Sequence, residues 1–144
     1  MNPENIFSIS GTLAMAGWII LIALPFWRSS DKFITGIIVT LFAIVYSWLI
    51  FSAFHWSDFS KFGTLDGVSN LFENRNLLLA GWIHYLAFDL MTGMFIVRNA
   101  RIYSIPHLLL APCLLLTFML GPMGLLLFLL LRSFYAKKYF ADNA

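Results

Sequence analysis

A histidine and an aspartate lie inside one long apolar run, and both are candidates for chemistry. The run extends from Leu77 to Val97 and carries His84 and Asp89 among Leu, Ala, Phe, Met and Trp side chains. Hydrocarbon cannot hydrate an ionised carboxylate, so Asp89 at the centre of a membrane span costs about 3 kcal/mol on insertion scales. We therefore expect this group to face the interior of a helix bundle and to have a function there.

The composition indicates an integral membrane protein. Hydrophobic residues make up 60% of the 144 residues, charged residues make up 11%, and the mean hydropathy is +0.83. A soluble domain has roughly 25% charged residues, so this chain could not cover a water-facing surface. The net charge of +2 includes no dense basic patch, which argues against nucleic acid as a partner. The length predicts a single domain over residues 1–144.

Four apolar runs are long enough to cross a bilayer, since a span needs about 20 apolar residues. They cover residues 6–26, 33–54, 77–97 and 105–131. The short turns inside the first and last pairs predict antiparallel hairpins, with both termini on one side of the membrane. The first run has no basic leader before it and no small-x-small cleavage site after it, so we expect a retained span in a bacterial inner membrane or its equivalent.

This topology leaves the orientation open. The terminal side would hold five basic residues, and the other side would hold four. That difference is too small for the positive-inside rule. The two sets are Lys61, Arg75, Arg132, Lys137 and Lys138 on the terminal side, and Arg28, Lys32, Arg98 and Arg101 on the other.

The longest connection between the apolar runs extends from His55 to Asn76. Apolar residues recur every three or four positions in the connection, which predicts a short amphipathic helix on the membrane interface. A lid over the bundle is the alternative. Pro112 and Pro122 should bend the fourth span, because each lacks an amide proton. The predicted fold is all-α, with four transmembrane helices and an amphipathic helix between the second and third.

His84 and Asp89 are five residues apart, which places them roughly 140° apart around a helix. Both could point into one central cavity, or one could face inward while the other reaches a neighbouring helix. We take them as the candidate catalytic pair, although Asp89 could instead pair with a donor and fix the helix register. The candidate substrate-binding residues are Trp82, Tyr85, Phe88, Thr92 and His107.

Metal and cofactor chemistry is not expected from the motifs. His55, Asp58 and Glu73 could form a small oxygen-and-nitrogen metal site, but their spacing matches no recognised metal motif. No binding motif for a flavin, haem or nicotinamide is visible, so we expect no cofactor. Cys113 is the only cysteine and is expected to be a buried, inert thiol.

Two strings carry a family resemblance. Residues 78–89 read LLAGWIHYLAFD, and residues 107–124 read HLLLAPCLLLTFMLGPMG. Together with the loop Leu65–Phe72, they resemble the ABA4-like family of integral membrane proteins. The His-Tyr-Leu-Ala-Phe-Asp and Phe-x-x-Gly-Pro-x-Gly strings are the most specific parts. The plant members are associated with the formation of neoxanthin from violaxanthin in plastid membranes. The resemblance therefore implies a protein that handles a carotenoid or another isoprenoid lipid.

Three functions are compatible with these features. The first is a cofactor-independent isomerase that opens an epoxide, with Asp89 as proton donor and His84 as base, or with the roles reversed. The second is a non-catalytic pigment- or lipid-binding protein, or an assembly protein. The third is a small transporter, which would need to oligomerise. The expected partners are a hydrophobic small molecule, membrane lipids and, for the transporter, further copies of the chain.

Overall fold

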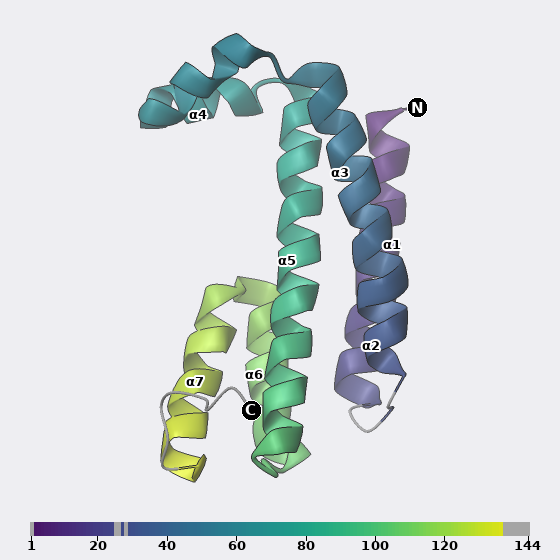
Figure 1. Cartoon of the computed structure of the whole chain (residues 1–144), viewed down its shortest axis with the longest axis vertical. Helices are drawn as coiled ribbons and strands as arrows, with labels where there is room; N and C mark the ends of the chain where they lie inside the picture. Colours follow the sequence, from purple (N-terminus) through teal and green to yellow (C-terminus); the bar gives the residue numbers. More distant parts are fainter. Residues whose placement is uncertain (1, 25–26, 28, 137–144) are drawn as a thin grey trace.

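The computed structural model describes residues 2–24, 27 and 29–136, and within them every regular element is a helix. The predicted end of the first run at Phe26 lies outside these residues. Figure 1 labels the larger helices along the chain. In order they are α1 (Pro3–Ala23), α2 (Ser30–Phe33), the π-helix η1 (Ile34–Val39), α3 (Thr40–Ala53), the 3-10 helix η2 (Trp56–Gly63), α4 (Leu65–Phe72), α5 (Arg75–Ile102), α6 (His107–Leu120) and α7 (Pro122–Ala136).

Three of the four predicted runs form helices long and apolar enough to cross a membrane. They are Pro3–Ala23, the continuous helix Ser30–Ala53 built from α2, η1 and α3, and Arg75–Ile102. Large apolar side chains point outward from all of them, for example Ile19, Phe51 and Phe88. Such a surface suits lipid rather than water. The prediction of an all-helical chain with membrane-spanning helices is confirmed to this extent.

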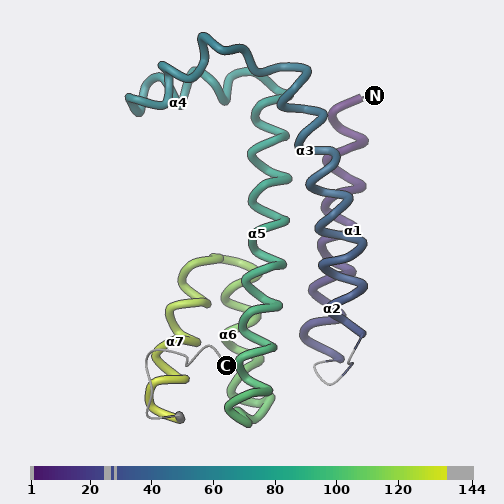
Figure 2. Tube along the Cα trace, in the orientation of Figure 1, coloured from purple at the N-terminus to yellow at the C-terminus, as the bar shows by residue number. Residues whose placement is uncertain are grey.

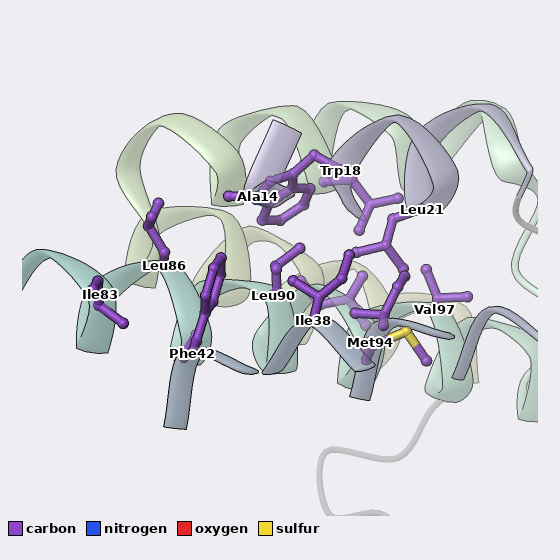
Figure 3. Packing of buried hydrophobic residues seen from close by; sticks show 14 of the residues in the cluster. Ala14, Trp18, Leu21, Ile38, Phe42, Ile83, Leu86, Leu90, Met94 and Val97 are labelled. Atoms are coloured by element: carbon purple, nitrogen blue, oxygen red, sulfur yellow. The ribbon is translucent and has the colours of Figure 1, made fainter. Parts of the chain in front are cut away.

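The helix α5 is the centre of the structure. Of its most apolar stretch 56% is buried, compared with 33% for α1 and 28% for Ser30–Ala53. Figure 3 shows the packing that causes this difference, with side chains of α1 and α3 meeting one side of α5. Trp18 and Leu21 press against the α5 backbone at Gly93, where an added Cβ would lie 2.8 Å from a Leu21 methyl. The small residue therefore lets α1 approach closely.

The prediction of a single fourth span over residues 105–131 is not confirmed. The run forms two helices, α6 of 14 residues and α7 of 15, which pack against each other and run in opposite directions (Figures 1 and 2). At 1.5 Å per residue each is about 22 Å long, short of the roughly 30 Å hydrocarbon core. The physical reason is a backbone reversal at Gly121, which has φ +43°, followed by Pro122. We call this pair the α6–α7 hairpin.

The C-terminus lies outside the described residues, so the prediction that both termini share one side of the membrane stays a prediction, but the described end of α7 does not lie beside the start of α1. The α6–α7 hairpin turns back halfway along α5, so α7 ends at the opposite end of the molecule from the start of α1 (Figure 1). Two ion pairs define these ends. Glu4 pairs with Arg75 at one end, and Asp31 pairs with Arg98 at the other.

The connection between the second and third runs forms a projecting arm. Its 3-10 helix η2 and the helix α4 extend sideways from the bundle at the end where α1 begins (Figure 1). Several of its aromatic and leucine side chains are exposed, including Trp56 at 88% and Leu65 at 86%. The expected short helix is therefore present as α4, and its position on a membrane interface stays a prediction. We call η2 and α4 together the arm.

The hairpin changes the charge distribution and predicts an orientation. Among the described residues the arm end now carries Lys61 and Arg75, whereas the other end carries Lys32, Arg98, Arg101 and Arg132. The positive-inside rule places the richer end in the cytoplasm. In a Cys113→Ala background, we expect a cysteine at Ser29 to be protected from a membrane-impermeant maleimide in intact cells. A cysteine at Ser69 on the arm should react.

The same cells after permeabilisation provide the control, because both cysteines should then be labelled. Labelling of Ser29→Cys but not Ser69→Cys in intact cells would reverse the orientation.

Candidate functional site: an aromatic pocket and an intrahelical carboxyl

His84 and Asp89 lie in different surroundings on α5. The His84 ring is exposed on one side of the helix, stacked on Phe88 with 4.4 Å between ring centroids. It lies 5.7 Å from the ring of Tyr46 on α3. Asp89 is only 8% exposed and faces the α6–α7 hairpin. The structure therefore shows the arrangement in which the two side chains point to different neighbours.

A cavity of about 500 Å³ lies where the arm meets α3 and α5, and it is partly open to the outside. We call it the arm pocket. Only two of its lining residues, Tyr46 and His84, carry a polar side-chain group. The remaining lining residues are Ile50, Phe54, Phe59, Phe62, Val68, Leu71, Phe72, Leu77, Ala80 and Gly81. Both the volume and the apolar lining with few polar groups are typical of small-molecule sites.

Aromatic contacts shape the pocket wall. The Phe54 ring meets Phe59 edge-on at 5.0 Å and Phe62 at 5.9 Å, which ties the end of the second span to the arm. On α5, a Cβ added to Gly81 would lie 2.9 Å from the Phe72 ring. The glycine thus leaves room for an arm aromatic against the α5 helix.

Polar caps hold the arm in place. Asp58 accepts a hydrogen bond from the His55 backbone at 2.9 Å, and its carboxylate pairs with Lys61 at 2.8 Å. The Lys61 hydrogen bond, followed by the His55 amide, holds the pKa of Asp58 below its ordinary value. The Thr64 hydroxyl then caps α4 by accepting the Gly67 amide at 3.1 Å. The start of the arm is therefore fixed by short-range polar contacts.

Asp89 sits at the middle of α5, as residue 15 of 28. The position that a Cβ would take on Gly121 lies 2.8 Å from Asp89 Oδ1 and 3.7 Å from Oδ2. The turn of the α6–α7 hairpin therefore rests directly on the carboxyl. Tyr85, one helical turn earlier, interacts with the same carboxyl through its hydroxyl. Within the described residues, Asp89 Oδ2 is buried and has no hydrogen-bond partner.

Two glycines make this close contact feasible. Gly121 takes a left-handed φ of +43° that L side chains rarely adopt, and a side chain there would also collide with Asp89. Gly124, one turn into α7, packs on the Thr117 backbone of α6, where no Cβ would fit. The Thr117 hydroxyl is satisfied by the Cys113 carbonyl at 2.7 Å. The hairpin is thus joined backbone to backbone at its tip.

The other predicted substrate-binding residues do not form one site. Trp82 is 37% exposed and lies against Phe7 of α1 and Tyr85, with ring centroids 5.3 and 5.5 Å away. The Thr92 hydroxyl donates to the Phe88 carbonyl at 2.8 Å. His107 begins α6 at the end of the molecule away from the arm, in a separate cavity of about 360 Å³. Only Phe88, through its stack on His84, lies beside the arm pocket.

The suggested metal ligands are not gathered into a site. In the described part of the chain, no group of three His, Cys, Asp or Glu side chains could hold a metal ion. Asp58 has Lys61 as its close partner instead, and the His55 ring nitrogen is 3.8 Å from the carboxylate. Cys113 is a free, buried thiol that donates to the Leu109 carbonyl.

Sequence reasoning missed the pocket aromatics and Gly121. The spacing of Phe59, Phe62 and Phe72 fits a helix on the membrane interface equally well, so the pattern predicts lipid contact and not a pocket wall. Tyr46 lies in an apolar run without any motif, so no local pattern singled it out. A Gly-Pro pair near the centre of a 27-residue run was the available indication of a turn at Gly121, since both residues disfavour a continuous helix.

Three apolar helices of spanning length, with large apolar side chains exposed around them, place the chain among the multi-helix membrane proteins. The sequence matches the ABA DEFICIENT 4-like family over residues 5–128, a range that includes both the arm pocket and the α6–α7 hairpin tip. The chain therefore belongs to the ABA4-like family. Neither the curated proteins nor the solved structures contain a significant match.

The packing at the hairpin tip predicts opposite effects for two alanine substitutions. Gly124→Ala should destabilise the protein by about 1–3 kcal/mol, because its Cβ overlaps the Thr117 backbone. Gly11→Ala on α1 has nothing within 4 Å of the new Cβ, so it should be neutral or stabilising by up to about 1 kcal/mol. Unfolding of both variants in detergent measures the difference. Equal stabilities would show that the tip is not closely packed.

Proposed function

We propose that this protein binds a long hydrophobic small molecule, a carotenoid or another isoprenoid lipid, in the arm pocket. The observation that carries the proposal is the composition of the 500 Å³ cavity, which has mostly aromatic and aliphatic walls and only Tyr46 and His84 as polar groups. A rigid apolar ring packs well against Phe side chains, while a phenol and an imidazole can hydrogen-bond one oxygen of the ligand. Family membership supports the same ligand class.

The opening of the pocket suits a ligand longer than the cavity. The arm pocket is partly open, and α3 and α5, which both line it, also carry exposed apolar side chains such as Trp48, Phe51 and Phe88. One end group of a linear isoprenoid would occupy the cavity, and the remainder would lie along these side chains in the lipid. The arm itself would rest on the membrane interface with Trp56 and Leu65 in the lipid.

Binding has stronger support than acid–base isomerisation. An isomerase that used both predicted groups would need the acid and the base near one reacting centre. Asp89 lies about 7.5 Å further along the α5 axis than His84 and roughly 140° around it. The pocket lining includes His84 but not Asp89. We therefore assign His84 to ligand binding, and an isomerase step would have to use it without Asp89 as its direct partner.

The cellular setting follows from the same proposal. The protein would act within a bacterial inner membrane or an equivalent membrane, as a single multi-pass domain. It would draw its ligand laterally from the bilayer, and lipids would be its immediate neighbours. A homo-oligomer is compatible with the exposed apolar faces of α1 and α3.

Filling the pocket should remove the ligand. Gly81→Leu places a branched side chain against Phe72 and into the cavity. We expect the amount of isoprenoid that copurifies, measured by mass spectrometry of lipid extracts, to fall at least about tenfold, which corresponds to about 1.4 kcal/mol of affinity. Gly11→Leu is the matched control, because nothing lies within 4 Å of that site on α1.

Three results can be distinguished. Loss of the isoprenoid from Gly81→Leu alone supports the arm pocket. Equal amounts from both variants and the unmodified protein would place the ligand elsewhere. The absence of any isoprenoid from the unmodified protein would contradict the ligand class.

A further inference from the structure

One oxygen of the Asp89 carboxyl lacks the hydrogen bond that a buried polar atom needs. The residue is 92% buried at the midpoint of the longest helix, and in the described part of the chain its Oδ2 atom has no partner. Both carboxyl oxygens lie within 4 Å of the site where Gly121 would carry a Cβ. The carboxyl is therefore aimed at the point where α6 ends and α7 begins.

The turn between α6 and α7 also contains backbone groups that have no backbone hydrogen-bond partner. Among the described residues, no amide outside the helical ladder donates to the carbonyls of Phe118, Met119 or Leu120, the last three of α6. The Met123 amide, in the first turn of α7, finds no backbone acceptor there either. Because α6 and α7 are antiparallel, both of these helix ends point the same way, toward the arm (Figure 2).

Hydrocarbon cannot satisfy this set of groups. Each unpaired polar group left in lipid costs several kcal/mol, and irregular backbone at membrane depth persists only where protein or water lines it. The acceptors outnumber the donors at this place, with Oδ2 and three carbonyls against one free amide. An occupant rich in hydrogen-bond donors is therefore required.

We propose that Asp89 and the turn of the α6–α7 hairpin form a hydrated proton-binding site at mid-membrane depth. One proton binds the carboxylate and gives a neutral carboxylic acid. That acid and a bound water donate to the exposed α6 carbonyls, and the water accepts from the Met123 amide. The proton enters and leaves through water. A proton fits better than a metal ion because Asp89 is a single carboxylate, and no three ligating side chains gather in the described residues.

Within the part of the chain that the structure describes, no other charged side chain lies near enough to replace the proton. Tyr85 on α5 is the titratable group that interacts with Asp89. The titratable groups of α1 and of the hairpin are distributed along their lengths: Glu4 at the start of α1, His107 and Cys113 on α6, and Arg132 and Tyr135 near the end of α7. By helix rise, His107 lies about 21 Å and Arg132 about 16 Å from the tip of the hairpin, and Cys113 lies about two turns from it.

Infrared spectroscopy of the ligand-free full chain in lipid vesicles tests the site. The expected result is a C=O stretching band of a protonated carboxyl that titrates with pH and shifts in D2O. The band should be lost completely in Asp89→Asn and unchanged in Asp66→Asn, a matched control on the exposed arm. If Asp89→Asn does not fold, labelling the unmodified protein with [4-13C]aspartate must shift the band, since Asp89 is the only aspartate buried in the three candidate spans.

Each other outcome overturns the proposal. The absence, at every pH, of a band that depends on Asp89 means a permanently ionised carboxylate. A band that D2O does not shift means that water does not reach the site. Loss of the band when sodium replaces choline at constant pH means that an alkali cation occupies it. Because no isoprenoid is present, these results are independent of the ligand proposed for the arm pocket.

Discussion

The contact between the Asp89 carboxyl and the Gly121 turn is the constraint on which the rest of the structure depends. A carboxyl at the middle of an apolar helix needs a polar neighbour at the same depth, and a continuous fourth helix would offer only its closed hydrogen-bond ladder. Breaking that helix at Gly121 provides helix ends beside the carboxyl. The break has a second effect, because α7 must then return along α6 instead of continuing to the far side.

Because α7 returns along α6, part of α5 stays uncovered between the Gly121 turn and the arm. The α6–α7 hairpin covers only the half of α5 that lies away from the arm (Figure 1). Side chains of α5 such as Phe88 stay exposed. His84, one turn before Phe88 on α5, lines the arm pocket. Three helices of spanning length and one shorter hairpin thus leave space beside the central helix, which a closed four-helix bundle would fill.

Much of the fold could be predicted from the sequence, because long apolar runs leave few alternatives to membrane-spanning helices. Asp89 faces the α6–α7 hairpin, whereas His84 lines the arm pocket. This is one of the two arrangements that their five-residue spacing allows. The hairpin could not be predicted with the same ease. Proline bends many helices without reversing them, and only the combination of a left-handed Gly121 with the Gly124 contact forces a turn. The pocket depends on where the arm folds back, which involves residues distant in sequence such as Phe72 and Gly81.

The half-depth hairpin is tested most directly by a distance between its outer ends. Leu108 and Phe134 are both more than 80% exposed and lie symmetrically about Gly121, so spin labels there would not disturb packing. In a Cys113→Ala background, pulsed electron paramagnetic resonance of the doubly labelled protein in lipid should give about 10–20 Å, the spacing of adjacent helices plus the label arms. A distance of about 39 Å, the rise of 26 residues in one helix, would contradict the account.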